Sequence, residues 1–258
     1  MALSMACDCG TTIEGPDLDL LQDAFLVHVR AEHTDWPYPD VAVKNYAAAT
    51  QRLAPVEPRR ESIGDVEVHR VDESRLDDWG AFFDRDAFAG KPEWAACYCS
   101  EPHCFPKGGN PSDEVMRPWQ ESRRITLDLL RDGRSFGYLA YVDGRPAAWV
   151  NASLRSEYAL YREGEGADPG DGDVIGVSCF IVAPPYRRHG LADRLLERVI
   201  ADAPARGAAW IEAYPFVAEH DDDAGNFRGP RPMWDARGFV EVARTDRHAI
   251  VRRPVSER

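Results

Sequence analysis

The sequence lacks any apolar run long enough to cross a membrane, because no stretch approaches the ~20 residues that a spanning helix needs. Its start, MALSMACDCG, has neither the basic region nor the long apolar region of a secretory signal peptide. We therefore expect a cytoplasmic protein without a membrane partner. In that reducing compartment, the six cysteines are expected to bind metal or to stay as free thiols rather than to form disulfides.

The chain also lacks an excess of positive charge. It has 31 lysine and arginine residues against 44 aspartate and glutamate residues, which gives a net charge of −13. Such a surface repels nucleic-acid phosphates and favours cations in its clefts, so we expect no nucleic-acid partner. The simpler interpretation is that the acidity only keeps the protein in solution.

A short segment without hydrophobic periodicity divides the chain. Residues 54–64 are rich in proline and charge, and they predict a linker between a module at residues 1–58 and a main domain at residues 65–255. Apolar residues at helical spacing predict a helix over 17–32, and a second is expected over 39–53. Two short helices bury too little apolar surface to be stable without a metal or a neighbouring domain.

The main domain mixes strand and helix patterns. Apolar segments of strand length occur at residues 66–71, 136–142, 147–153, 174–182 and 208–214. Asp143-Gly144 is a strong hairpin signal, and the unbroken apolar segment 174–182 predicts burial on both faces. Helices are expected over 112–131, 190–207 and 232–237, before a strand pair at the end of the chain. Together these patterns predict an α/β (α+β) fold with an antiparallel first half.

The loop between the buried strand and the next helix carries a pattern suited to anions, Val182-Ala-Pro-Pro-Tyr-Arg-Arg-His-Gly-Leu-Ala192. The N-terminus of a helix offers unpaired N–H groups and the positive end of the helix dipole, which together favour a pyrophosphate. Gly190 lets the backbone approach a phosphate closely, and Arg187 and Arg188 add positive charge. The loop has neither the GxxxxGK(S/T) pattern of a nucleotide P-loop nor the GxGxxG of a dinucleotide fold.

Arg187-Arg-His-Gly-Leu-Ala192 resembles the (Q/R)xxGx(G/A) signature of the GNAT acetyltransferases, and Val182-Ala-Pro-Pro-Tyr186 resembles the segment that precedes it in that family. The next strand and the closing Met233-Trp-Asp-Ala-Arg-Gly-Phe239 follow in the family's order and spacing. The resemblance covers about residues 65–255. It implies the GNAT fold, a mixed and mainly antiparallel sheet with splayed central strands and flanking helices.

The resemblance also implies an N-acyltransferase that moves an acetyl group from acetyl-CoA directly to an amine. The backbone of Phe180, Ile181 and Val182 is then expected to bind the pantetheine arm. The pyrophosphate is expected to bind at Arg187, Arg188, His189, Gly190, Leu191 and Ala192.

The amine must lose a proton before it attacks, so a general base is needed. Glu212 is the candidate, because it interrupts an apolar strand where the resemblance places the splay; alternatively it is a solvated or salt-bridged strand residue. In many family members a tyrosine of the last helix is the general acid, but this chain has Trp234 there, which has no proton to give a thiolate. Tyr214 is the candidate substitute.

Two cysteines and two histidines in the N-terminal module form a candidate zinc site. Cys7, Cys9, His28 and His33 supply two thiolates and two imidazoles, which tetrahedral Zn²⁺ accepts. The segment also resembles a small bacterial domain of unknown function that has CxCG, a helix and two histidines. The alternative is a helical cap with an incidental histidine pair.

A second cluster, Cys97, Cys99, His103 and Cys104, spans too few residues for unstrained tetrahedral closure. We interpret it as free thiols in the wall of the acceptor cleft. Cys179 lies within a buried strand and is expected to be a small apolar filler.

The expected partner is a cationic small-molecule amine acceptor, and the expected assembly is a homodimer. Acidic stretches at 163–173 and 219–223 are either solvated loops or attract that amine. Two alternatives remain. The protein is a protein acetyltransferase for lysine or N-terminal amines with the module as a docking domain, or it is a non-catalytic regulator that binds acyl-CoA.

Overall fold

The computed structural model describes residues 2–104, 116–158, 173–218, 220 and 222–255. The N-terminal module contains a hairpin of β1 (Leu3–Ala6) and β2 (Thr12–Gly15), followed by α1 (Leu18–Glu32) and α2 (Asp40–Arg52). Both helices confirm the prediction, and the Asp17 side chain caps α1 by accepting from the N–H of Leu20 at 2.9 Å. The hairpin was not predicted, because strands of four residues are too short to show an alternating pattern.

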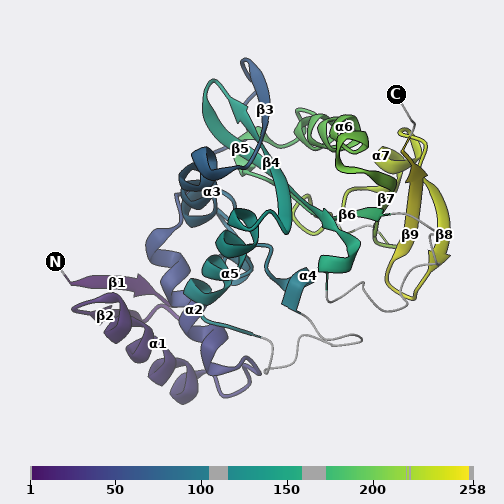
Figure 1. The fold of residues 1–258 in the computed structure, drawn as a ribbon. Helices are drawn as coiled ribbons and strands as arrows, with labels where there is room; N and C mark the ends of the chain where they lie inside the picture. The colour runs from purple at the N-terminus through teal and green to yellow at the C-terminus, as the bar shows by residue number, and fades with distance from the viewer. Residues whose placement is uncertain (1, 105–115, 159–172, 219, 221, 256–258) are drawn as a thin grey trace.

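The main domain is built on one seven-stranded sheet (Figure 1). Its strands lie in the order β3-β4-β5-β6-β7-β9-β8, and every neighbouring pair is antiparallel except β6 and β7. The strands are β3 (Val66–Arg70), β4 (Ser135–Val142), β5 (Arg145–Leu154), β6 (Asp173–Val182), β7 (Ala208–Ala213), β8 (Val240–Arg244) and β9 (Ala249–Pro254). The expected mixed, mainly antiparallel sheet is confirmed.

The helices of the main domain are α3 (Leu76–Ala81), α4 (Glu101–Cys104), α5 (Trp119–Arg131), α6 (Leu191–Asp202) and α7 (Arg231–Asp235). One π turn at Phe82–Asp86 extends α3, and short 3₁₀ turns occur at Glu73–Arg75, Pro92–Trp94, Arg155–Glu157, Pro184–Tyr186 and Pro204–Arg206. The expected helix over 112–131 is wrong at its start, because α5 begins after Pro118; residues 112–115 lie outside the described part. The helix predicted to end near residue 207 ends earlier, since α6 stops at Asp202 because Pro204 interrupts the helix.

Helices cover both faces of the sheet. Leu139 and Trp149 are register partners on β4 and β5, and Trp149 packs against Trp79 of α3, with ring centroids 6.2 Å apart. The neighbouring Tyr138 donates a hydrogen bond to Asp202 of α6 at 3.0 Å. Successive residues of a strand point to opposite faces, so α3 and α6 lie on opposite sides of the sheet.

The hairpin between β4 and β5 turns at Asp143 and Gly144. Their φ angles are +50° and +76°, the left-handed values that a two-residue I′ turn requires at both positions. The hairpin prediction is confirmed.

The two central strands separate partway along their length. β6 and β7 are paired only as far as Val177 and Ala213, although β6 continues to Val182. The register of β6 against β5 shifts at Ser178, which is an extra residue in β6, and such a bulge bends a strand. The expected splay is therefore present, and it exposes one edge of β6 beyond residue 178.

The module packs on the main domain through α2. Ala47 belongs to the apolar core of the module, whereas Ala49 belongs to that of the main domain. Arg52 donates hydrogen bonds to the carbonyl of Ala95 at 2.8 Å and to the hydroxyl of Tyr98 at 2.9 Å. In Figure 1 the module lies beside α5, far from β8 and β9. Residues 54–65 form no helix or strand, so the predicted boundary falls in irregular chain.

None of the described helices is both long enough and apolar enough to span a membrane.

Candidate functional site

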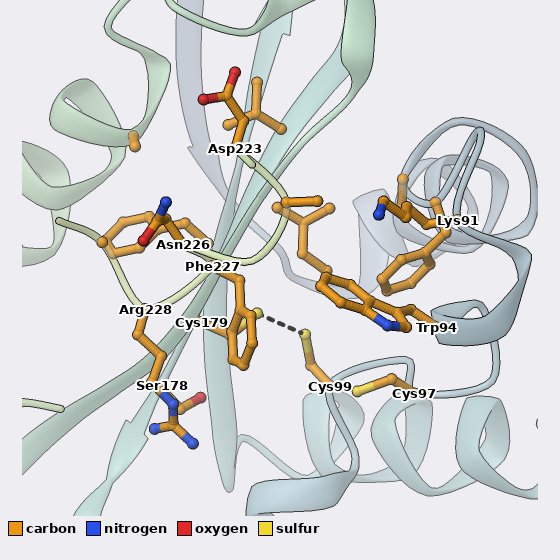
Figure 2. Close-up of a pocket in the computed structure, with 18 of the residues that line it drawn as sticks. Lys91, Trp94, Cys97, Cys99, Ser178, Cys179, Asp223, Asn226, Phe227 and Arg228 are labelled. Carbon is orange, nitrogen blue, oxygen red and sulfur yellow. Dashed lines mark hydrogen bonds between the residues drawn. The ribbon is translucent and has the colours of Figure 1, made fainter. Parts of the chain in front are cut away.

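A cavity of about 580 Å³ opens where β6 separates from β7. Its walls come from β6, from the loop and first turn of α6, from segments 87–102 and 116–122, and from segment 223–233 (Figure 2). Eight of the nine residues expected to bind the cofactor line it: Phe180, Ile181, Val182, Arg187, Arg188, Gly190, Leu191 and Ala192. His189 does not line it, because its ring nitrogen Nε2 lies 3.0 Å from the carbonyl oxygen of Arg60.

The loop before α6 has the backbone of an anion site. Gly190 is the N-cap of α6 with a φ of +75°, and no atom lies within 4 Å of the position that a Cβ would take. Arg188 also has a positive φ, +63°, although it is not glycine. The first N–H groups of α6 therefore lie at the cavity, with open space in front of Gly190.

Two arginines stand beside this helix N-terminus. Burial lowers the pKa of Arg187, and its Nε donates to the carbonyl of Val182 at 3.0 Å. Arg188 forms an ion pair with Asp223 across the cavity mouth. Both guanidinium groups stay charged at neutral pH, so the loop combines backbone donors with two cations.

The edge of β6 that the splay exposes is bonded in part by another segment. The N–H of Phe180 donates to the carbonyl of Phe227 at 2.6 Å, and Figure 2 shows segment 223–228 crossing in front of β6. The N–H of Val182 lies on the same edge, because alternate residues of a strand share one edge. Of the three residues expected to bind the pantetheine arm, Phe180 thus has a protein partner already, and Ile181 directs its N–H toward β5.

Thiols form one wall of the cavity, as expected for Cys97 and Cys99. Tyr98 and Cys99 are consecutive residues with positive φ, +47° and +55°, and this uncommon turn directs the thiols to the cavity. Cys99 Sγ lies 3.7 Å from Cys179 Sγ. Cys179 is half-buried; it packs against the core of the main domain and also lines the cavity, so its expected role as a small apolar filler stays a prediction.

His103 and Cys104 are turned away from this wall. His103 Nδ1 lies 3.1 Å from the carbonyl oxygen of Glu157, and its ring lies beside Tyr158, with centroids 4.8 Å apart. Neither residue lines the cavity. The four side chains therefore do not converge, which agrees with free thiols rather than a metal site.

One carboxylate in the cavity wall escaped the sequence analysis. Glu101 begins α4 and lines the cavity, and burial raises its pKa against the opposing effect of Arg228. The Glu101 side chain is exposed to solvent within the cavity, although protein surrounds its carboxylate on most sides. A four-residue helix inside a Pro- and Cys-rich stretch has no periodicity to reveal which side chain faces a cavity.

Glu212 and Tyr214 lie together, but not in the cavity. Glu212 is fully buried, with Oε1 accepting from the Tyr214 hydroxyl at 2.7 Å and Oε2 accepting from Arg252 Nε at 3.0 Å and Arg155 Nη1 at 3.4 Å. Its register partner on β6 is Gly176, before the splay. The placement expected for Glu212 is therefore corrected: it forms a buried ion pair, the alternative that its sequence context left open. The catalytic roles of both residues stay predictions.

Trp234 occupies the position where the resemblance implies an acid. It is fully buried, its Nε1 donates to the carbonyl of Arg228 at 3.1 Å, and its ring packs against Phe180 and Phe239. Trp234 thus holds segment 228–229 in place. It does not line the cavity.

The four candidate metal ligands of the module do converge. The ligand atoms of Cys7, Cys9, His28 and His33 all lie within 4.8 Å of one another. Most residues of the acidic stretches at 163–173 and 219–223 lie outside the described part of the chain. The structure describes four of them: Asp173, His220, Asp222 and Asp223.

Part of the chain that forms this cavity matches a known protein family. Residues 94–227 match the model of the Acetyltransferase (GNAT) family. An aminoglycoside N(6′)-acetyltransferase type 1 of Acinetobacter genomosp. 13 is 28% identical over 146 residues, which are 52% of this chain and 90% of the relative.

Solved structures similar to this one have low sequence identity. An aminoglycoside N-acetyltransferase AAC(6′)-Iy in complex with CoA has a TM-score of 0.44 and 15% identity, over 72% of this chain and 95% of that one. The ribosomal-protein-S18-alanine N-acetyltransferase of Escherichia coli has a TM-score of 0.41 and 17% identity, over 75% and 96%. Because the family model matches more than half of the chain, the protein belongs to the GNAT acetyltransferase family.

Proposed function

We propose that the protein transfers an acetyl group from acetyl-CoA to the amine of a small cationic molecule within a ternary complex. One observation carries the proposal: a single cavity joins the anion-binding loop at Gly190 to the wall that contains Glu101. A donor with a pyrophosphate at one end and a thioester at the other fits such a cavity, and an amine can approach from the carboxylate side.

The donor side is formed by the N-terminus of α6 with Arg187 and Arg188. These groups suit the pyrophosphate, because backbone N–H donors and fixed positive charge both act on it. The N–H of Val182 suits the pantetheine arm. Use of the Phe180 N–H requires the carbonyl of Phe227 to move away first.

The acceptor side supplies the proton acceptor. An amine with a pKa near ~10 arrives protonated, and it must lose a proton before its nitrogen attacks the thioester carbon and the C–S bond breaks. We assign the proton acceptor to Glu101 rather than to Glu212, because Glu101 lines the cavity and its raised pKa suits a general base. The departing thiolate then takes a proton from solvent or from the Glu101 carboxyl.

The chemical class of the acceptor is supported by charge and by the sequence relative. The chain has a net charge of −13, which attracts cations, and Glu93 and Glu101 line the cavity. The relative is named for acetylation of an aminoglycoside, a sugar that carries several ammonium groups.

The decisive experiment measures thiol release from acetyl-CoA with a panel of acceptors: an aminoglycoside, a polyamine, a neutral amino sugar, and peptides with a free lysine or N-terminal amine. We expect turnover with one of the cationic small molecules. Turnover with peptides alone would instead establish a protein acetyltransferase. Tight acetyl-CoA binding without any turnover across the panel would support a regulator.

A substitution tests the assignment of the base. Glu101→Gln should lower kcat by about 10²- to 10⁴-fold while acetyl-CoA affinity stays unchanged, because general base catalysis contributes about that factor. Glu67→Gln, on β3 and outside the cavity, is the matched control and should keep wild-type kinetics. Normal kcat in Glu101→Gln would remove Glu101 as the base.

A further inference from the structure

The side chains of Cys7, Cys9, His28 and His33 meet at one end of the N-terminal module, away from the cavity. Cys7 Sγ lies 3.2 Å from His33 Nε2, and Cys9 Sγ lies 3.4 Å from His28 Nε2. In the described part of the chain, no other group of three or more Cys, His, Asp or Glu side chains brings its ligand atoms together in this way.

These separations match a tetrahedral zinc site. Bonds of about 2.3 Å to sulfur and about 2.0 Å to nitrogen at a tetrahedral angle place sulfur and nitrogen about 3.5 Å apart. Two thiolates and two neutral imidazoles also balance the charge of one Zn²⁺. Four protein ligands leave no open position, which is typical of a structural rather than a catalytic site.

The backbone holds the two cysteines on the same side of the β1–β2 turn. The N–H of Cys7 donates to the carbonyl of Thr11 at 2.9 Å, and the N–H of Gly10 donates to the carbonyl of Cys7 at 2.8 Å. Gly10 has a φ of +88°, a value that glycine adopts without strain. The turn is thus fixed by its own hydrogen bonds.

The two histidines are fixed by α1. His28 lies in its last turns, and His33 is its C-cap, with its N–H donating to the carbonyl of Val29 at 2.9 Å. The His33 ring stacks on Trp36, with centroids 4.9 Å apart. Because the turn and the helix end are each fixed separately, the ligand set needs little rearrangement to close around an ion.

The module has a small core to hold these pieces together. Its buried apolar cluster has eight members: Met5, Cys7, Ile13, Leu21, Phe25, Val29, Val43 and Ala47. Cores of this size rarely sustain a fold alone, and small domains commonly rely on a metal or a neighbour. A metal at Cys7 and His33 would join the hairpin to α1 at the edge of this cluster.

The module in turn shapes the cavity. Asn45 of α2 lines the cavity; its Nδ2 donates to the carbonyl of Arg117 at 2.7 Å, and its Oδ1 accepts from the N–H of Trp119 at 3.0 Å. α2 packs on α1 through Val43 and Ala47. The start of α5 is therefore held by a helix whose own position depends on the module core.

We infer that Cys7, Cys9, His28 and His33 bind one structural Zn²⁺, and that the ion stabilises the position of α2 and so the cavity wall at Asn45 and Arg117. The inference stands apart from acyl transfer, because its evidence and its readouts lie in the module.

Metal analysis of the full-length protein tests the site. Protein purified without chelators from zinc-supplemented medium should contain one zinc per chain by elemental mass spectrometry. Cys7→Ser/Cys9→Ser should lose it, and so should His33→Gln, whereas Cys104→Ser and His69→Gln, which change the same residue types elsewhere, should retain it. Wild-type protein without zinc, or a double variant that keeps it, would overturn the inference.

Cobalt substitution tests the ligands without relying on variant folding. Exchange of the wild-type protein with Co²⁺ should produce thiolate-to-cobalt charge-transfer absorption and the visible bands of tetrahedral Co²⁺. Pink, octahedral cobalt without the charge-transfer band would exclude coordination by the two thiolates.

Hydrogen exchange tests the link to the cavity. The N–H of Trp119 donates a hydrogen bond to Asn45 Oδ1, so removal of zinc from the wild type with a chelator should accelerate hydrogen exchange at this N–H. The N–H of Val150, in the centre of the sheet, should stay protected. Unchanged exchange at Trp119 after complete zinc loss would overturn the second part of the inference. Absence of acetyl transfer would leave both tests intact.

Discussion

The main domain and the N-terminal module are stabilised in different ways. The main domain buries aromatic side chains on both sides of a seven-stranded sheet, with Trp79, Trp149 and Trp234 fully enclosed. The module has eight buried apolar residues around a two-stranded hairpin and two helices. Hydrophobic burial suffices for the first, whereas the second depends on its neighbour and, by our inference, on an ion. One part of the cavity wall, at Asn45, comes from the smaller region.

The largest expected effect lies in the interior of the main domain. Glu212→Gln leaves the buried Arg252 without its carboxylate partner, so it should lower the free energy of unfolding by about 3–5 kcal/mol. Denaturant unfolding measures this change. The module should be unaffected, with zinc content unchanged.

Glu241→Gln is the matched control for Glu212→Gln, because Glu241 also accepts from two arginines, Arg231 and Arg244, but at the surface. We expect little change in stability from it. If Glu212→Gln instead keeps full stability and loses turnover, Glu212 is the catalytic base predicted from the sequence and Glu101 is not.

Tyr214→Phe removes the hydroxyl that donates to Glu212. It should leave turnover unchanged, because Tyr214 and Glu212 both lie outside the cavity.

A pair of core substitutions compares the two regions directly. Phe25 in the module and Leu195 on α6 are both fully enclosed, and each truncation to alanine creates a cavity that costs about 3 kcal/mol. Leu195→Ala should lower the main unfolding transition. Phe25→Ala should lower the zinc affinity and loosen the module while the main transition moves little. One common transition, shifted equally by both, would show that the regions unfold as a single unit.

A smaller effect is expected for binding at the loop of α6. Gly190→Glu places a carboxylate in open space beside the helix N-terminus and gives a side chain a φ of +75°. Acetyl-CoA affinity should fall by about 100-fold, which is ~2.7 kcal/mol, because like charges meet at the pyrophosphate. Calorimetry measures this loss, and zinc content is the control. Equal affinity in wild type and variant would remove the donor site from this loop.

The smallest effect is a pH dependence of stability at His103, because solvent screening weakens the contribution of a partly exposed ring. Burial lowers the pKa of His103 to about 4, below the ~6.5 of an unfolded chain. The folded state thus favours the neutral ring, so its contribution to stability is fully present above pH ~6.5 and is lost as the pH falls toward 4. His103→Gln should flatten the loss of stability across that range.

Local patterns in the sequence predicted the local structure well. Helical spacing of apolar residues located α1, and Asp143-Gly144 located the β4–β5 turn. The strand–loop–helix unit around Gly190 followed from a change in hydrophobic period. Eight of nine residues assigned to the donor site line the cavity for this reason: they are neighbours in sequence as well as in space.

Contacts between distant residues could not be predicted in the same way. Glu212 is paired with Arg252, forty positions further on, through the adjacent strand β9, and no pattern near Glu212 reveals that partner. Glu101 reaches the cavity from a helix of four residues, and Phe227 reaches β6 from an irregular segment. The anion-binding loop could therefore be located from the sequence. The residues that surround the acceptor could be identified only from the three-dimensional structure.

The thiol wall has a consequence for side reactions. A thiol beside an acyl thioester can take the acyl group itself, because thiolates attack thioesters readily. Burial raises the pKa of Cys99 well above its usual range. A hydrogen bond with Cys99 lowers the pKa of Cys97, but burial and the nearby Glu101 outweigh it, so the pKa of Cys97 is raised as well. Both side chains thus stay protonated and weakly nucleophilic at neutral pH. If the thioester binds in this cavity as we propose, these protonated thiols should not take the acyl group, and the amine is left as the effective nucleophile.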